Sequence, residues 1–146
     1  MQLQIQREEE SVAGLRVLVI DDVIDSKELV EMYLKLHDAK VMAVDRAKDA
    51  FRLLTSFQPE LIISDIYMPE KDGYWLIEEL NKINQQSRNR ILTIALTVAA
   101  KKEDRQKLIE AGYDGYLAKP FFFEDLTALV VKLLGQKKLK SNYRSQ

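Results

Sequence analysis

Short apolar runs alternate with longer amphipathic segments along most of this 146-residue chain. The runs are rich in Val, Ile and Leu and have few polar positions, which is typical of strands that are buried on both faces. They lie at residues 16–20, 40–44, 61–64, 91–96 and 115–118. We therefore predict five short strands that are separated by helical segments.

A helix is predicted after each strand, because apolar residues recur there at helical spacing. Asp25 and Glu28 resemble a capping box at the start of the first helix. The other four helices are expected at residues 47–57, 74–84, 103–111 and 123–134. Gly112 and Gly135 are predicted to end the last two. Five strand–helix units with short loops indicate an α/β fold, in which helices cover both faces of a parallel sheet.

The two ends of the chain differ from the part between them. Residues 1–14 are polar and charged, and residues 136–146 contain four basic residues and no acid. We expect a polar N-terminal extension (1–14), one folded domain (15–135) and a basic C-terminal tail (136–146). Either end could instead extend the element beside it.

Composition limits the classes of protein that fit. A net charge of −1 gives no reason to expect binding to nucleic acid or to an anionic membrane. Cysteine is absent, which excludes disulfides and thiolate metal sites and fits a reducing compartment. Acids occupy the N-terminus where a signal peptide needs apolar residues, and no apolar run is long enough to span a membrane. We expect a soluble cytoplasmic protein.

Polar residues with complementary chemistry follow four of the predicted strands. Asp21 and Asp22 follow the first, Asp65 the third, Thr97 the fourth and Lys119 the fifth. Any one of them could simply cap a helix or lie in a solvated turn. In a parallel sheet, however, these positions share the edge at the carboxyl ends of the strands, where ligands bind. Solvated loops alone do not explain why all five occur there.

The charges of this set predict its chemistry. Three clustered carboxylates repel one another and need a cation, and a set of oxygen ligands with few protein donors suits Mg²⁺. A carboxylate beside Mg²⁺ can attack phosphorus, because the metal neutralises the developing charge. Lys119 and Thr97 could hold the phosphoryl oxygens. Asp65 is therefore a candidate phosphate acceptor.

Four motifs together resemble the CheY-like receiver domain of two-component response regulators. They are Asp21-Asp22, the stretch SDIYMPEKDGYWL around Asp65, ALT ending at Thr97, and DGYLAKPF around Lys119. The resemblance covers about residues 15–134. It implies a flavodoxin-like (βα)5 three-layer sandwich with a five-stranded parallel sheet. It also implies phosphotransfer from a histidine kinase or a histidine phosphotransfer protein to one aspartate.

The same resemblance gives roles to the acidic residues. Asp65 resembles the phosphorylated aspartate. Asp22 is similar to a direct Mg²⁺ ligand and Asp21 to an indirect or second one. The Tyr67 carbonyl would complete the protein ligands.

It also implies roles for residues of the last two strands. Thr97 resembles the switch hydroxyl, and Tyr116 the aromatic residue that turns inward when Thr97 moves. Lys119 resembles the phosphate-binding lysine, and Lys119–Pro120 the family's cis peptide. Phosphorylation would then shift the face formed by the fourth helix, fifth strand and fifth helix, which would control a protein partner.

Three positions affect what the resemblance implies. Val98 stands where the family usually has alanine after the switch threonine, which bears on the freedom of that loop. Tyr67 and Ala99 occupy positions that tune phosphoryl lifetime in the family. An aromatic ring and a side chain without a polar group should shield an acyl phosphate from water.

Other functions fit the sequence less well. A phosphatase that uses an aspartyl phosphate requires Asp-x-Asp after the first strand, whereas these acids are adjacent. A nucleotide or flavin binder lacks a glycine-rich turn there. A receiver-like scaffold that acts without phosphorylation, and the receiver module of a hybrid sensor histidine kinase, remain as alternatives. The chain is not expected to be an enzyme beyond its own phosphorylation and dephosphorylation.

Overall fold

The computed structural model describes residues 11–87, 89–98 and 101–144. Within these residues, five strands form one parallel sheet in the order β2-β1-β3-β4-β5. The strands are β1 (Arg16–Ile20), β2 (Lys40–Val44), β3 (Leu61–Asp65), β4 (Leu92–Thr97) and β5 (Gly115–Ala118). The predicted strands are confirmed. β3 includes the acid that follows its apolar run, and β4 begins and ends one residue later than expected.

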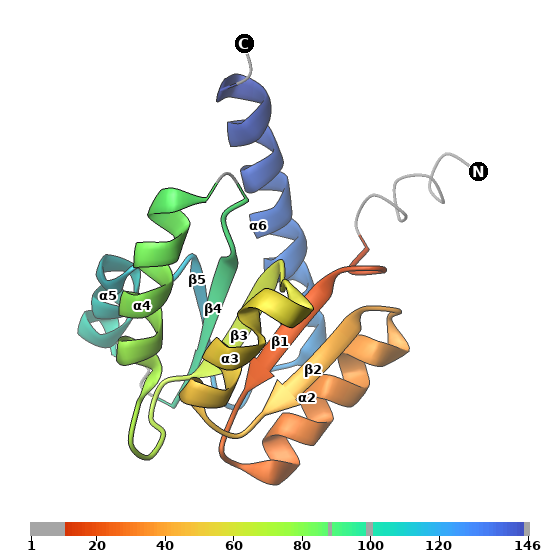
Figure 1. The fold of residues 1–146 in the computed structure, drawn as a ribbon. Coiled ribbons are helices and arrows are strands. Elements are labelled where there is room, and N and C mark those ends of the chain that lie inside the picture. The colour runs from red at the N-terminus through yellow and green to blue at the C-terminus, as the bar shows by residue number, and fades with distance from the viewer. Residues whose placement is uncertain (1–10, 88, 99–100, 145–146) are drawn as a thin grey trace.

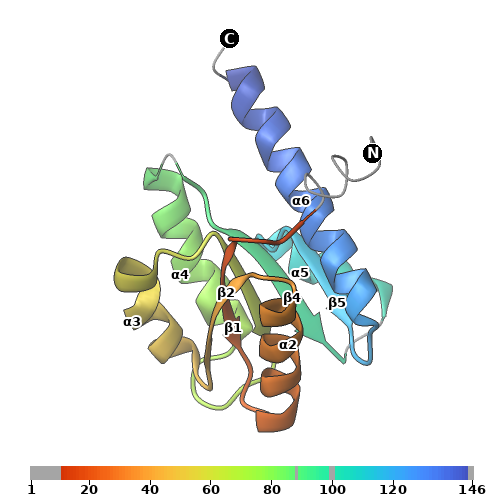
Figure 2. The same ribbon diagram turned by 90° about the vertical axis from the view of Figure 1, so that its right-hand side faces the viewer.

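Helices cover both faces of the sheet, as the sequence predicted (Figures 1 and 2). In the described residues they are α2 (Ile24–Leu36), α3 (Ala47–Phe57), α4 (Gly73–Gln86), α5 (Lys102–Ala111) and α6 (Phe123–Arg144). This arrangement is the flavodoxin-like three-layer sandwich. Strand order reverses between β1 and β3, and ligands of such sheets bind beyond the carboxyl ends of the strands at this point.

Alternating residues of the central strands form separate cores on the two faces. Val17 and Val19 point to one face, where they pack in a cluster with residues of α2 and α6. Leu18 and Ile20 point to the other face, in a cluster with residues of α3 and α4. A third cluster lies between α4 and α5 and contains Ile66, Ile77, Ala95, Leu108 and Tyr113. Ile66, the first residue after β3, belongs to this third cluster.

The packed part of the chain begins before β1. Val12 is fully buried in the α2–α6 core, and the Gly14 amide donates to the Asp38 carbonyl at 2.9 Å. These contacts hold the segment that enters β1 against the turn after α2.

The expected capping box at the start of the first helix is wrong. α2 begins at Ile24 with Val23 as its N-cap residue, and Asp25 lies inside the first turn without capping it. The Val23 amide instead donates to Asp21 Oδ1 at 2.9 Å. This contact turns the chain immediately after β1, so the helix begins earlier than the Asp25–Glu28 spacing indicated.

The predicted end of the last helix at Gly135 is also wrong. α6 continues through Gly135 to Arg144, and it projects past the sheet at the end opposite the carboxyl ends of the strands (Figure 1). Gly135 does not have the positive φ of a helix-ending glycine, whereas Gly112 (φ +118°) ends α5 as predicted. Residues 136–144, which were expected to belong to a basic tail, therefore extend the last helix, the alternative stated for this segment.

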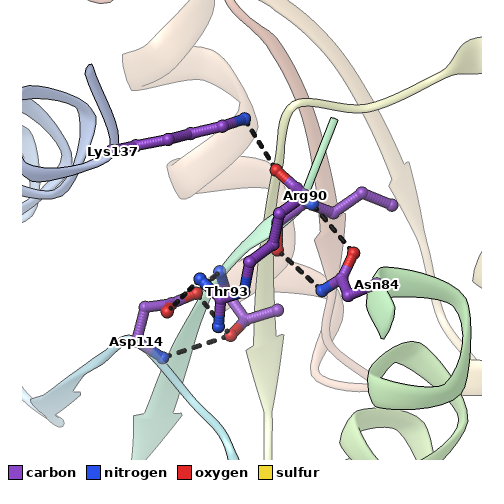
Figure 3. A network of polar contacts seen from close by, with 6 residues as sticks. Asn84, Arg90, Thr93, Asp114 and Lys137 are labelled. Carbon is purple, nitrogen blue, oxygen red and sulfur yellow. Dashed lines mark hydrogen bonds and ion pairs between the residues drawn. The ribbon is translucent and has the colours of Figure 1, made fainter. Parts of the chain in front are cut away.

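A polar network near the amino end of β4 contacts the extended helix (Figure 3). Lys137 Nζ donates to the Arg90 carbonyl at 2.6 Å, and the Arg90 guanidinium pairs with Asp114 at 2.6 Å. Asp114 also accepts from the Thr93 amide at 2.9 Å. Partial burial lowers the pKa of Lys137. The network links α6 beyond Gly135 to the sheet.

We expect Gly135→Ala to raise the free energy of unfolding by about 0.5–1 kcal/mol, because alanine loses less backbone entropy within a helix. No atom lies within 4 Å of an added Cβ, so nothing opposes the substitution. Urea denaturation would measure the change. The matched variant Gly112→Ala should destabilise the protein, because of its positive φ and the Asn81 side chain 2.7 Å from the added Cβ. A helix that in fact ended at Gly135 would make both variants destabilising.

Candidate functional site

The five residues singled out in the sequence lie at the carboxyl ends of neighbouring strands. Asp21 directly follows β1, Asp65 ends β3, Thr97 ends β4, and Lys119 follows β5; Asp22 comes next after Asp21. All these strands are parallel, so their carboxyl ends lie at one edge of the sheet, called here the carboxyl edge. The prediction that parallel strands gather these positions at one edge is confirmed.

The three carboxylates form one compact cluster. One oxygen from each of Asp21, Asp22 and Asp65 lies within 4.8 Å of the others. Asp21 is only 1% exposed, Asp65 is buried and Asp22 is exposed. Two carboxylates are therefore held inside the protein, and the third opens the cluster to solvent. We call this cluster the acidic pocket.

Lys119 reaches into the acidic pocket. Its Nζ lies 3.0 Å from Asp21 Oδ2 and 3.6 Å from Asp65 Oδ2. The Lys119 side chain is 18% exposed, so this ammonium acts in a partly desolvated environment, where a charge interaction is stronger than in water. One positive charge faces three negative ones, which leaves the pocket short of cationic charge.

Backbone amides orient the two buried carboxylates. Asp21 Oδ1 accepts from the Val23 amide at 2.9 Å, and Asp65 Oδ1 accepts from the Ile66 amide at 2.8 Å. The second oxygen of each carboxylate is the one that faces Lys119. Each carboxylate is thus fixed from two sides and presents a defined oxygen to the pocket.

Burial raises the pKa of Asp65 above its ordinary value. The Lys119 charge opposes this rise, whereas Asp21 and Asp22 add to it. A raised pKa in the folded state means that ionising Asp65 costs stability as pH rises through that pKa. The folded protein therefore gains from anything that neutralises this carboxylate at neutral pH, whether a proton or a cation.

The residues present fit a hard divalent cation. The acidic pocket offers only carboxylate oxygens, from the side chains of Asp21 (1% exposed), Asp65 (12% exposed) and the exposed Asp22. Mg²⁺ prefers a few carboxylates together with retained waters. Thiolate ligands, which would favour a softer metal, are excluded because the chain has no cysteine.

Thr97 and Tyr116 lie beside the pocket on β4 and β5. Thr97 is 1% exposed, and its carbonyl accepts from the Lys119 amide at 2.7 Å. Tyr116 is half-buried, with the Arg105 guanidinium 5.9 Å from its ring centroid. The Lys119–Pro120 peptide is cis, as the resemblance implied. The two segments that bear Thr97 and Lys119 are therefore linked by a backbone hydrogen bond.

The surroundings of the pocket are partly apolar and exposed. The side chains of Tyr67 and Val98 are mostly exposed, and so is Phe122, the middle residue of Phe121–Phe123. Phe121 and Phe123 pack against the core instead. Ala99, expected to influence phosphoryl lifetime, lies outside the described residues.

One buried contact, to the start of α4, was not anticipated from the sequence. The Tyr113 hydroxyl donates to the Gly73 carbonyl at 2.6 Å, across 40 residues of chain. A partial signal was present, because Gly112 was predicted to end a helix and Gly73 lies in the quoted stretch around Asp65. Nothing local indicated that the side chain after one glycine would reach the carbonyl of the other.

The family model of the response regulator receiver domain matches residues 17–131. This match spans most of the chain and every residue of the acidic pocket. The protein therefore belongs to the response regulator receiver domain family, whose members are signalling domains of two-component systems rather than catalytic enzymes.

Individual relatives agree with this assignment. An uncharacterised 14.6 kDa protein of Leptolyngbya boryana is 36% identical over 121 residues, which cover 83% of this chain and 91% of the relative. A probable transcriptional regulator, ycf29, of Porphyra purpurea is 38% identical over 125 residues, which cover 86% of this chain but only 58% of the relative. The chain spans about half the length of several other curated relatives that it matches.

A solved structure with the same fold is the receiver domain of the histidine kinase CKI1 from Arabidopsis thaliana, complexed with Mg²⁺ and BeF3⁻. It is 27% identical, with a TM-score of 0.74, and the match covers 87% of this chain and 94% of that one. No helix in the described part of this chain is both long and apolar enough to cross a membrane.

Proposed function

We propose that this protein is the phosphoacceptor of a two-component phosphorelay and that Asp65 receives the phosphoryl group. The observation that carries the proposal is the meeting of Asp65 with two further carboxylates and the Lys119 ammonium at the carboxyl edge. The donor is a phosphohistidine on a histidine kinase or a histidine phosphotransfer protein. The CKI1 receiver supports this assignment, because BeF3⁻ and Mg²⁺ bind a related chain.

In the transfer, an Asp65 carboxylate oxygen forms a bond to phosphorus as the bond from phosphorus to the histidine nitrogen breaks. The electron pair of the broken bond stays on the imidazole, and the product on this chain is an acyl phosphate. The Ile66 amide donates to Asp65 Oδ1, which leaves Oδ2 on the side of Lys119 as the attacking atom. No other nucleophile is needed.

The remaining residues of the site bind and orient. Asp22 and Asp65 would hold Mg²⁺ directly and Asp21 through water or as a second ligand, with the Tyr67 carbonyl completing the protein ligands. Asp21 suits an indirect role, because its two oxygens already accept from Val23 and Lys119. When bound, the metal supplies positive charge against the phosphoryl oxygens.

Lys119 and Thr97 would recognise the phosphoryl group after transfer. The ammonium lies 3.6 Å from Asp65 and can follow the added negative charge, about −1.5 to −2 at neutral pH. The Thr97 hydroxyl would donate to a phosphoryl oxygen if the loop after β4 closed inward. Tyr116 could then turn further into the space behind Thr97.

The output is a change on the face formed by α5, β5 and α6. Tyr116 lies on this face, and the chain after Thr97 leads into α5. A movement of Thr97 is therefore transmitted to this face first. The partner is proposed to be a protein. The chain could act alone or as the receiver module of a hybrid sensor histidine kinase. The CKI1 receiver, which is a domain of a histidine kinase, is a precedent for the second alternative.

The acceptor can be tested with a small phosphodonor. We expect acetyl phosphate plus Mg²⁺ to add one acid-stable, base-labile phosphoryl group to the wild-type protein, and mass spectrometry should place it on Asp65. Asp65→Asn is the control and should remain unlabelled, because the amide cannot attack phosphorus. Label on His37 or on a serine would contradict the proposal. An unlabelled wild type that also fails to bind beryllofluoride would favour a scaffold that acts without phosphorylation.

A further inference from the structure

The segment between β3 and α4 determines where the proposed acceptor and metal ligands lie. Residues 66–72 form this segment, called here the acceptor loop; it follows Asp65 and contains Tyr67. The Gly73 amide donates to the Ile66 carbonyl at 2.8 Å, which closes the loop at its base. A Cβ on Gly73 would lie 2.8 Å from Ile66 Cα and 2.9 Å from the Asp65 carbonyl oxygen. Any movement of Gly73 is therefore passed directly to Asp65 and Ile66.

Tyr113 fixes the position of Gly73 through a hydrogen bond from its buried side chain. Its hydroxyl donates to the Gly73 carbonyl at 2.6 Å, and the side chain is buried in the α4–α5 cluster with Ile66 and Leu108. The Tyr113 backbone is fixed as well, because its amide donates to the Leu108 carbonyl where Gly112 ends α5. Because both its backbone amide and its hydroxyl are hydrogen-bonded, Tyr113 connects the end of α5 rigidly to the start of α4.

Ser64 holds the backbone of the acceptor residue beside Gly73. The Ser64 hydroxyl donates to the carbonyl of Asp65 at 2.8 Å, and a Cβ on Gly73 would approach this same carbonyl oxygen to 2.9 Å. Burial raises the pKa of Tyr113 far above its ordinary value. The phenol therefore stays protonated at neutral pH and donates to the Gly73 carbonyl.

We infer that Tyr113 is a positioning residue for the acceptor loop, and that its hydroxyl holds the Asp65 carboxylate and the Tyr67 carbonyl in the arrangement that binds Mg²⁺ and the phosphoryl group. The inference rests on the proposed function of Asp65. The hydroxyl of Tyr113 donates to Gly73 and not to a carboxylate, so Tyr113 acts on the site through Gly73. A buried donor that fixes one backbone carbonyl restricts the loop more than apolar packing alone does.

The chain offers a matched control for a purely structural role. Tyr33 also has a partly buried hydroxyl with one side-chain partner, Thr127 Oγ1 at 2.9 Å, and it links α2 to α6 away from the acceptor loop. Tyr33→Phe and Tyr113→Phe each remove one oxygen atom and one hydrogen bond. They differ in whether the bond that is lost supports the loop.

Two measurements on the full chain test the inference. The first is amide hydrogen exchange of residues 66–74 without metal, where we expect faster exchange in Tyr113→Phe and wild-type exchange in Tyr33→Phe. The second is a titration with Mg²⁺, alone and with beryllofluoride, followed by the fluorescence of Trp75, the single tryptophan, in the first turn of α4. We expect Tyr113→Phe to bind both about 3- to 10-fold more weakly, the factor that corresponds to one hydrogen bond.

The outcomes separate the two ideas. Faster loop exchange with weaker binding in Tyr113→Phe alone supports the positioning role. Equal effects in both variants, or unchanged exchange of residues 66–74 in Tyr113→Phe, would overturn it and leave the proposed function intact. If wild-type protein binds neither Mg²⁺ nor beryllofluoride, the proposed function fails, and the exchange comparison still decides whether Tyr113 holds the loop.

Discussion

Lys119→Met is expected to lower the free energy of unfolding of the metal-free protein by about 2–3 kcal/mol. Removing one partner of a buried ion pair usually costs about 3–5 kcal/mol, because the other charge is left uncompensated. We take a smaller value because Asp22 opens the acidic pocket to water. Asp21, which is 1% exposed and 3.0 Å from the lysine, accounts for most of the loss. Urea denaturation in EDTA would measure it.

Added Mg²⁺ should restore much of this stability. Without the lysine, three carboxylates face one another with no cation, so the variant should bind Mg²⁺ at least as tightly as the wild type. Binding of beryllofluoride should change in the opposite direction and weaken by about 30-fold or more, since a charged partner contributes about 2 kcal/mol or more to such a contact. Both affinities can be followed through Trp75 fluorescence.

Lys27→Met is the matched control for this prediction. The Lys27 side chain is 16% exposed, close to the 18% of Lys119, but its partner Asp45 is 58% exposed. An exposed carboxylate is solvated when its partner is removed, so the loss should be about 1 kcal/mol or less and independent of Mg²⁺. Equal losses in the two variants, or weaker Mg²⁺ binding by Lys119→Met, would show that Lys119 does not neutralise the acidic pocket.

Gly73→Ala is expected to destabilise the protein by about 3 kcal/mol and to weaken Mg²⁺ binding strongly. The added methyl would meet Ile66 Cα at 2.8 Å and the Asp65 carbonyl at 2.9 Å, and backbone atoms cannot move aside as a flexible side chain can. Overpacking of this kind costs about 1–3 kcal/mol. Displacement also strains the hydrogen bond from Gly73 to Ile66, which takes the expected loss to the top of that range. Thermal or urea unfolding and a Mg²⁺ titration would measure the two effects.

Gly115→Ala provides the comparison for this variant. Its added Cβ would lie 3.2–3.3 Å from side-chain methyls of Leu129 and Leu133, which can shift by a few tenths of an ångström. We expect a loss of about 1 kcal/mol with unchanged Mg²⁺ affinity, because β5 at this point lies away from the acidic pocket. A Gly73→Ala protein that folds and binds Mg²⁺ like the wild type would show that the acceptor loop tolerates displacement.

Most of the fold could be predicted from local pattern. Strands buried on both faces must be apolar throughout, and short loops between alternating strands and helices require a parallel sheet, so β1 to β5 could be found within one residue at each end. The acidic pocket was predictable for a related reason. Parallel strands place their carboxyl ends at one edge, and this converts the positions of Asp21, Asp65 and Lys119 in the sequence into neighbours in space.

The two errors arose where other contacts, one distant and one local, override the expected signals. Glycine is a residue type that often ends a helix, but α6 continues through Gly135. The contact of Lys137 with the Arg90 carbonyl links the following turn to the sheet. The Asp25–Glu28 pair has the spacing of a capping box, but the Val23 amide is already bound by Asp21 and the helix begins earlier.

The sequence by itself determined the order of the strands and helices, the edge of the sheet at which the candidate site residues lie, and the residue types at that edge. These follow from local periodicity and from the rule that parallel strands end together. Only the tertiary structure decided that Lys119 pairs with Asp21, across 98 residues, and that Tyr113 reaches Gly73, across 40. Neither contact leaves a local pattern, because the energy of a long-range hydrogen bond depends on where the packed helices place its two ends and not on the residues beside them.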